Sequence, residues 1–437
     1  MSDLFKLFAR KRMMRSVCCA GILIFLDVFS LSAQPAVQDT LVINLRRAEK
    51  MFLDSNLLLL AQKYNIDAQK ALVLQARLYP NPNLSVGRGP LIPLHNPTAD
   101  FGTNFDNTAS LSQLILLAGK RNKAVKLAEA NTTLAEYQFF DLLRTLKYTL
   151  RTDFFNIYYL QQSAKVYKSE IAALKQVADA FVAQKGKGYV AEKDVVRIQA
   201  QLYSFESEYN DLLNQINSVE AELRLVLQVK PSKYLVPQPD TVSLQKLDPL
   251  AHPFRALLDS AFKNRTDLQM AKANTEINKR NYTYQKALAV PDLTVSLSYD
   301  HQGSYVTDFN ALGLSMDLPT FNRNQGNIKM AKIMIDNTLA LEQSTLAAVE
   351  DNIAVAFEKT FAETKLSRQI DPKYLVDFDR LMHEVMKSYM SKEISILDFL
   401  DFYDAYKQNM LQCNNIRYGQ VQAFEDLNYY TATNFFN

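Results

Sequence analysis

The chain is poor in the residues from which catalytic and metal centres are built. Its 437 residues include no tryptophan, 3 cysteines, 4 histidines and only 11 glycines. No two histidines stand four residues apart, as they would on one helical face of a zinc site; they are His95, His252, His301 and His383. No glycine-rich loop ending in Lys-Ser or Lys-Thr follows a predicted strand, and no nucleophile stands out beside a base. The sequence therefore predicts a protein that is not an enzyme and that holds neither a cofactor nor a metal.

An excess of one charge is also missing. Lys and Arg total 49 and Asp and Glu total 46. The first 33 residues hold five of the basic and two of the acidic side chains, so 44 of each remain beyond that segment. Electrostatic binding to nucleic acid needs a basic surface. The balanced chain predicts no nucleic-acid partner.

The N-terminus has the pattern of a secretory signal peptide. Three basic residues between positions 11 and 15 precede an apolar stretch at 17–29, and small residues follow up to Ala33. We predict that residues 1–33 are removed on export. Cys413 is then the one cysteine left, which excludes an intrachain disulfide. No later stretch approaches the run of about 18 apolar residues that a membrane-spanning helix needs.

The rest of the chain contains two copies of one plan. Pro82 aligns with Pro291 and Asp194 aligns with Asp398, with only a small change of spacing between the two alignments. The stretch between the copies contains five prolines and predicts an irregular linker. The predicted division is a first repeat at 34–228, a linker at 229–253 and a second repeat at 254–437.

Each repeat is expected to contain a helix, two strands and a long helical hairpin. The long helices have almost no Gly or Pro, span 69 and 70 residues and would each be roughly 100 Å long. A globular domain has no use for such helices, but a coiled coil or a helical tube does. The predicted first helices are 45–78 and 253–289, the long helices are 119–187 and 323–392, and the returning helices are 194–227 and 398–430.

The predicted strands are amphipathic and too few to close a barrel. Apolar residues alternate with small or polar ones at 293–300 and again at 311–318, and less regularly in the first repeat, where Gln113 interrupts the pattern. Two repeats supply four strands, whereas a transmembrane barrel needs at least about eight. An open sheet edge is prohibitive in lipid, so three chains closing a sheet of twelve strands are expected if the strands span a membrane.

Three sequence motifs resemble the TolC-type outer-membrane efflux protein family. The first is Arg-Leu-Tyr-Pro-Asn-Pro-Asn-Leu-Ser at 77–85, the second is Leu-Pro-Thr-Phe-Asn-Arg-Asn-Gln-Gly-Asn-Ile at 318–328, and the third is Gly-Tyr-Val-Ala-Glu-Lys-Asp-Val-Val at 188–196. The first two motifs look most like the branch that works with heavy-metal cation exporters. Prolines at 80 and 82 also explain locally why a helix gives way to a strand there.

The resemblance implies a fold, a location and partners. The fold is mostly α with a small transmembrane β portion: a homotrimer whose twelve-stranded β-barrel in the bacterial outer membrane is continued by an α-helical barrel in the periplasm. The implied partners are a periplasmic adaptor protein, an inner-membrane pump of the RND type and outer-membrane lipid. The implied function is the passive exit duct of a tripartite efflux system. The alternatives are the duct of a type I protein-secretion system and a periplasmic coiled-coil scaffold without a pore.

Two groups of site residues follow from the resemblance. The hairpin ends would dock the adaptor through Gly188, Tyr189, Val190, Lys392, Glu393 and Ile394. The periplasmic gate would consist of Asp398, Asp401, Asp194 and Tyr389, with the tyrosine hydrogen-bonded to Asp194. An arginine usual in the family is replaced by Ile394, so one usual closing ion pair is not expected. The alternative for Asp398 and Asp401 is an ordinary solvated helix face.

A methionine repeat is the remaining feature with chemical potential. Met382, Met386 and Met390 recur every four residues beside His383. Thioethers bind soft Cu(I) or Ag(I), but a methionine stripe at helical spacing more often packs against a neighbouring helix. We therefore expect packing here.

Overall fold

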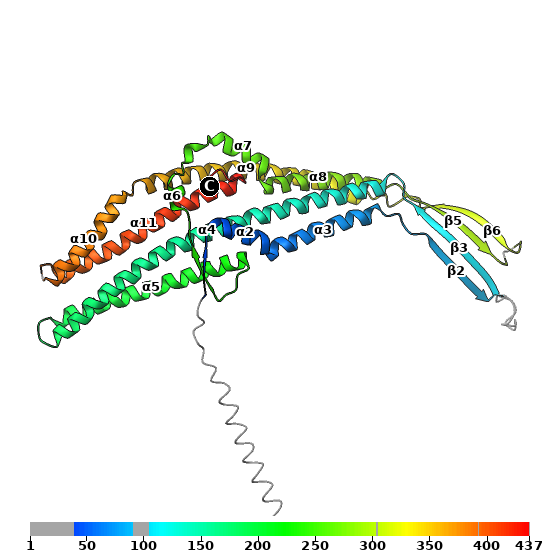
Figure 1. Cartoon of the computed structure of the whole chain (residues 1–437). Coiled ribbons are helices and arrows are strands. Elements are labelled where there is room, and N and C mark those ends of the chain that lie inside the picture. Colours follow the sequence, from blue (N-terminus) through cyan, green and yellow to red (C-terminus); the bar gives the residue numbers. More distant parts are fainter. Residues whose placement is uncertain (1–38, 91–104, 303–304, 392, 437) are drawn as a thin grey trace, which may run out of the picture.

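The computed structural model describes residues 39–90, 105–302, 305–391 and 393–436. The predicted signal peptide at 1–33 lies outside these residues. The molecule is elongated, with a small sheet at one end and two helical hairpins at the other (Figure 1). Within the described residues, no helix has an apolar stretch of the length that crossing a membrane requires.

Both repeats begin with a pair of short helices where one long helix was predicted. In the first repeat these are α2 (Leu45–Ser55) and α3 (Leu57–Arg77), and in the second they are α7 (Phe254–Asn264) and α8 (Thr266–Leu288). Asn56 breaks the first pair because its side-chain oxygen accepts the backbone N–H groups of Leu58 and Leu59, both at 3.0 Å. Arg265, which aligns with Asn56, occupies the break in the second pair. The two predicted single helices were therefore wrong in the same place.

The four predicted strands form one antiparallel sheet. They are β2 (Asn83–Pro90), β3 (Phe105–Ile115), β5 (Leu293–Asp300) and β6 (Phe309–Met316), in the order β2-β3-β5-β6. The two hairpins of the two repeats thus pair side by side. β2 and β6 are the outer strands of this sheet.

The sheet has one leucine-rich face and one face of small polar residues. One row across all four strands consists of leucines, namely Leu84, Leu111, Leu297 and Leu312. The adjacent row on the opposite face consists of Ser85, Ser110, Ser298 and Ala311. All four leucines are exposed to solvent in the isolated chain. The predicted alternation is confirmed in β5 and β6, and in β3 the predicted interruption, Gln113, lies on the leucine face beside Val295.

The two helical hairpins differ in continuity. In the first, α4 (Lys120–Lys185) runs unbroken for 66 residues and α5 (Glu192–Leu227) returns beside it. In the second, the outgoing arm is divided into α9 (Gln325–Arg368) and α10 (Pro372–Met390), and α11 (Ile396–Thr431) returns. Asp371 caps α10 by accepting the backbone N–H of Lys373 at 2.8 Å, and Pro372 cannot donate a helical hydrogen bond. The predicted continuous helix at 323–392 was wrong because of this break.

The predicted irregular linker contains regular structure. Strand β4 (Lys233–Pro237) pairs in parallel with β1 (Asp39–Ile43), and a short helix α6 (Thr241–Gln245) and a 3-10 turn η1 (Pro249–Ala251) follow. Ile43 and Leu235 of this ribbon are almost fully buried in a core shared with α2, α4 and α5. The linker therefore packs against the middle of the helical part of the molecule.

Candidate gate and docking site at the hairpin ends

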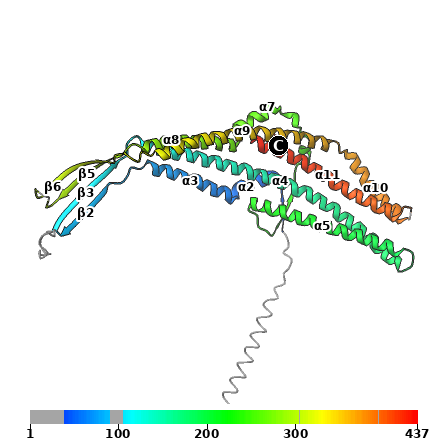
Figure 2. The same ribbon diagram turned by 180° about the vertical axis from the view of Figure 1, so that it is seen from behind.

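The two hairpins end together, at the end of the molecule farthest from the sheet (Figure 2). A single apolar core joins them there. It draws side chains from all four helices, including Leu174 of α4, Phe205 of α5, Met382 of α10 and Phe399 of α11. The predicted gate and docking residues lie around this core.

The first hairpin end is a glycine turn. Gly188 has φ +75°, in the left-handed region, and its N–H donates to Lys185 O at 2.9 Å. A Cβ added at Gly188 would meet no other described atom within 4 Å. Tyr189 beside it is 71% exposed, and Val190 is half-buried. The turn thus presents an aromatic side chain to the surroundings.

The second hairpin end is built differently. The Glu393 N–H donates to Ser388 O at 2.9 Å, and the Glu393 side chain is exposed. Ile394 is half-buried and packs against the shared core, so it is less available for docking than its neighbour. Lys392, the third predicted docking residue of this end, lies outside the described residues.

Asp398 caps the start of α11, a role that the sequence pattern did not predict. Its carboxylate accepts the Ser395 backbone N–H at 3.3 Å, while the Asp398 N–H donates to the Ser395 hydroxyl oxygen at 3.2 Å. This reciprocal arrangement is a capping box at the start of α11. Asp398 and Asp401 are both exposed. Asp194 holds the matching position in the first turn of α5 and is half-buried.

Tyr389 is held by ring stacking and lacks the predicted hydrogen bond. Its ring lies between Phe399, with centroids 4.2 Å apart, and Phe181, with centroids 5.6 Å apart. The hydroxyl is buried and has no hydrogen-bond partner among the described residues. Burial raises the pKa of the Tyr389 hydroxyl above its ordinary value, and the negative charge of Asp194 raises it further. The bond from Tyr389 to Asp194 is therefore not made within the single chain.

The methionine repeat divides between core and surface. Met382 is buried and Met386 packs against the same core, whereas Met390 is 69% exposed. Among the described residues, no cluster of three or more His, Cys, Asp or Glu side chains could hold a metal ion. The expected packing role holds for Met382 and Met386.

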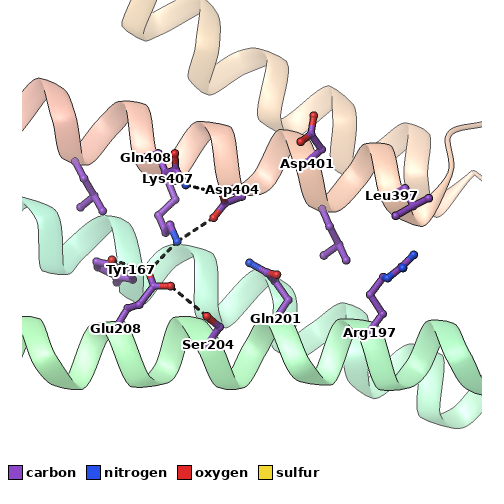
Figure 3. Close-up of a pocket in the computed structure, with 12 residues that line it drawn as sticks. Tyr167, Arg197, Gln201, Ser204, Glu208, Leu397, Asp401, Asp404, Lys407 and Gln408 are labelled. Carbon is purple, nitrogen blue, oxygen red and sulfur yellow. Dashed lines mark hydrogen bonds and ion pairs between the residues drawn. The ribbon is translucent and has the colours of Figure 1, made fainter.

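An open groove of about 670 Å³ lies between α5 and α11, just above the hairpin ends (Figure 3). Asp401 and Asp404 of α11 and Arg197 and Gln201 of α5 line it. Asp404 lies on the side of α11 that faces the polar side chains of α5, whereas the Asp401 carboxylate points away from α5 (Figure 3). It ends at a cluster of charged and aromatic side chains around Lys407.

Lys407 connects the two hairpins through a buried ammonium group. This residue is 4% exposed, and its Nζ lies 2.8 Å from Glu208 Oε2 of α5 and 3.0 Å from Asp404 Oδ1 of its own helix. The Nζ also lies 4.1 Å from the centroid of the Phe205 ring. The Tyr167 hydroxyl of α4 donates to the same Glu208 oxygen at 2.9 Å. Three helices therefore meet at one ion-pair cluster.

The cluster keeps the Glu208 carboxylate ionised. Burial alone would raise its pKa, but the hydrogen bonds from Lys407 and Tyr167 outweigh burial and lower the pKa. Sequence reasoning missed this pair because Lys407 and Glu208 are 199 residues apart. A lysine among the aromatic residues of a helix was the one available signal.

Further polar pairs cross the same interface toward the middle of the molecule. Arg151 of α4 lies 2.7 Å from Glu425 of α11, with both side chains almost fully buried. The Tyr148 hydroxyl donates to Asp426 at 2.6 Å. The two hairpins are thus joined by ionic contacts along their length, and Lys407 makes the charged contact nearest to the groove.

Comparisons with known proteins agree with this architecture. No protein-family model matches the chain. The cobalt-zinc-cadmium resistance protein CzcC of Cupriavidus metallidurans is 20% identical over 359 residues, which cover 82% of each protein. A solved structure of CusC superposes with a TM-score of 0.71 at 15% identity, over 92% of this chain and 95% of CusC. The CmeC outer membrane channel of Campylobacter jejuni gives 0.71 at 15% identity, over 89% of this chain and 85% of CmeC.

These likenesses extend over nearly the whole described chain and establish its fold. The resemblance predicted from the motifs at 77–85, 318–328 and 188–196 is confirmed.

Proposed function

We propose that this chain is the outer-membrane exit duct of a tripartite efflux system, through which substrates pass passively while an inner-membrane pump supplies the energy. The observation that carries the proposal is the four-stranded sheet with one leucine face and one serine face, continued directly by helices of up to 66 residues. A leucine face suits lipid, and a face of small polar residues suits a water-filled lumen. A coiled-coil scaffold needs neither face.

The duct is a homotrimer with a twelve-stranded barrel. β2 and β6 each have one edge that no strand of the described chain covers. The helices that continue them, α3 and α9, expose large apolar side chains, among them Leu57, Leu74, Ile333 and Leu341. A second copy placed beside the first joins β6 to β2 and α9 to α3. Three copies close both layers, which leaves no open edge in lipid.

The hairpin ends are the docking and gating region. Tyr189 and Glu393 are exposed at the two turns and would meet a periplasmic adaptor, which in turn connects to an RND-type pump. Asp398 and Asp401 of three chains would form an acidic ring at the entrance. Lys407 and Glu208 would restrain the closed state, because separating the hairpins breaks their hydrogen-bonded ion pair.

Heavy-metal cations are the substrates that the sequence relative favours. CzcC is named for cobalt, zinc and cadmium resistance. Deletion of the gene should lower the growth-inhibiting concentration of these metals, and the intact gene should restore it. Unchanged metal tolerance with increased sensitivity to drugs would assign the duct to drug export. Loss of a secreted protein with unchanged tolerance to both would favour type I secretion.

Two neighbouring substitutions test the barrel itself. Leu297→Arg places a charge on the leucine face and should block insertion, since arginine in lipid near the bilayer centre costs about 2–4 kcal/mol. Ser298→Arg changes the next residue on the opposite face, so it should insert and alter conductance. If both variants and the unchanged protein were recovered equally in a soluble periplasmic fraction, the result would support the scaffold instead.

A further inference from the structure

A histidine and an aspartate meet at the end of the sheet farthest from the helices, between the end of β5 and the start of β6 (Figure 1). His301 Nδ1 lies 2.9 Å from Asp308 Oδ1. The Tyr299 hydroxyl donates to the same carboxylate oxygen at 2.6 Å and lies 3.3 Å from His301 Nδ1. The imidazole is 48% exposed and the carboxylate side chain 62% exposed, so solvent reaches both.

Backbone contacts hold the two side chains together within one chain. The Asp308 N–H donates to His301 O at 3.0 Å, and the His301 N–H donates to Asn107 O of β3 at 3.0 Å. Asp308 has φ +59°, a left-handed conformation that aspartate and asparagine adopt more readily than most other residues. The imidazole and the carboxylate are therefore placed side by side by the turn itself.

The charges around this turn favour a cation. The described residues at this end of the sheet include three carboxylates, those of Asp106, Asp300 and Asp308, and one basic side chain, Arg88. One carboxylate oxygen of Asp106 is buried without a hydrogen-bond partner among the described residues. An excess of negative charge raises the local concentration of cations.

We infer that His301 and Asp308 bind one divalent transition-metal ion per chain, of the class of Zn²⁺, and that Tyr299 orients the carboxylate for it. An ion placed about 2.1 Å from each of two ligand atoms that are 2.9 Å apart sees them at roughly a right angle, which an open metal site accepts. An imidazole ligand suits zinc, copper or nickel, whereas magnesium and calcium take oxygen ligands. The inference does not depend on the proposed function, because one chain supplies every ligand.

Proton positions and neighbouring groups fit this assignment. A neutral imidazole carries its proton on either nitrogen, so His301 binds the ion through Nδ1 when its proton is on Nε2. The hydroxyl of Tyr299 keeps its contact with the carboxylate, as ligating carboxylates are commonly hydrogen-bonded. Water completes the coordination, since both side chains are open to solvent. The bound ion ties the end of β5 to the residue that precedes β6.

Zinc titration of the full chain tests the site. The protein is purified in detergent without a histidine tag and titrated with ZnCl₂ in a calorimeter, with one ion expected per chain. His301→Gln and Asp308→Asn should each weaken binding by at least about tenfold, because loss of even a hydrogen-bonded partner of a ligand costs 10- to 100-fold. Asparagine tolerates the left-handed backbone of position 308, so this variant removes the charge and keeps the turn.

Two further variants calibrate the result. Tyr299→Phe should weaken zinc binding by a smaller factor than the loss of either ligand, because it removes only the group that orients the carboxylate. His383→Gln changes an exposed histidine of α10 and should leave binding unchanged. Excess Mg²⁺ should not displace the zinc. Displacement by Mg²⁺ would contradict a site with an imidazole ligand.

A spectroscopic signature identifies the ligand. With Cu²⁺ as the probe, electron spin echo measurements should show the remote nitrogen of one bound imidazole in the unchanged protein and in His383→Gln, and not in His301→Gln. If the three side chains serve only as hydrogen bonds that close the turn, the variants would lower the melting temperature and no saturable zinc binding would be seen. That result, or zinc binding that survives both His301→Gln and Asp308→Asn, would overturn the site. Neither result bears on conductance, which tests the duct separately.

Discussion

The two helical hairpins have the same plan but different mechanical properties. The first has one unbroken 66-residue helix and a glycine turn, whereas the second is interrupted before Pro372 and re-enters helix through the Ser395–Asp398 capping box. A continuous helix transmits a displacement along its whole length, while a break allows one segment to turn relative to the next. The difference indicates that a duplicated unit can contain a continuous helix in one copy and an interrupted helix in the other.

The comparison also indicates which contacts hold the second hairpin against the first. Lys407 reaches across from the second hairpin to Glu208 of the first, and Tyr389 is stacked between one ring from each hairpin. In the proposed duct, opening of the entrance would separate these contacts. We therefore expect the largest effects from changes at a hairpin end, smaller ones from changes between the hairpins, and the smallest from single groups within them.

The largest effect is expected at the glycine turn of the first hairpin. Gly188→Arg places a bulky cation in the proposed docking surface at a residue with φ +75°, so export should be lost while trimers still assemble. Gly188→Asn is the matched control, because asparagine tolerates this backbone conformation and is small. Metal tolerance and native gel mobility are the two readouts. Normal tolerance with Gly188→Arg would remove this turn from the docking surface.

Breaking the charged contact between hairpins should open the entrance. Lys407→Met leaves Glu208 and Asp404 without their shared cation, so the open probability in single-channel recordings should rise several-fold. Arg197→Met removes an exposed cation of the same groove and should change gating little. If the two variants gate alike, the Lys407 cluster does not restrain closure.

A buried acid of the first hairpin should make stability depend on pH. Burial raises the pKa of Asp153 to about 7, and the charge of Glu222 contributes. The pKa of Asp153 is higher in the folded state than in the unfolded state, so the protonated carboxyl is favoured by folding. Its contribution to stability is complete below the unfolded-state pKa and is lost as pH rises through about 7. Asp153→Asn should abolish a decrease on the order of 3 kcal/mol between pH 4 and 8. A melting temperature equally dependent on pH in both proteins would assign the effect to another group.

The aspartates of the second hairpin should separate into two roles. Asp401→Ala should weaken block of the current by divalent cations added from the periplasmic side, if three chains place these carboxylates around one opening. Asp398→Ala should in addition lower stability by about 1 kcal/mol, because it removes half of the capping box. Block that survives both changes together would place the constriction elsewhere.

The smallest effect is expected at Tyr389. Its hydroxyl is buried without a partner among the described residues, so Tyr389→Phe retains the ring stack and removes an unsatisfied group. We expect the open probability to stay within about twofold and the stability to rise by up to about 1 kcal/mol. A large rise in open probability would mean that the hydroxyl finds Asp194 in the assembled, closed trimer.

Local patterns predicted most of the fold. Alternation of leucine with serine located the strands, and long stretches without Gly or Pro located α4, α5 and α11. Where one residue decides the backbone, the pattern was too coarse: Asn56 and Asp371 each cap a new helix inside a stretch that looks continuous. The ribbon of β1 and β4 joins segments nearly two hundred residues apart, which no local signal reveals.

The candidate site was less predictable than the fold. Resemblance located the two turns, and the first of them is marked locally by a glycine at a left-handed position. It did not locate the Lys407–Glu208 contact, which exists only because α11 packs beside α5. It assigned Tyr389 a hydrogen bond to Asp194, whereas in the single chain the ring is stacked and the hydroxyl has no partner among the described residues. Interactions between hairpins depend on packing geometry, and periodicity alone does not contain it.

The central claim is that three copies of this chain close into a water-filled duct. The most direct test is single-channel recording of the purified, reconstituted trimer, with Lys407→Met recorded beside it to favour the open state. The account predicts discrete conductance steps that are rare in the unchanged protein and frequent in the variant, and a changed conductance in Ser298→Arg. A bilayer that stays silent with all three proteins, although each is inserted as a trimer, would contradict it.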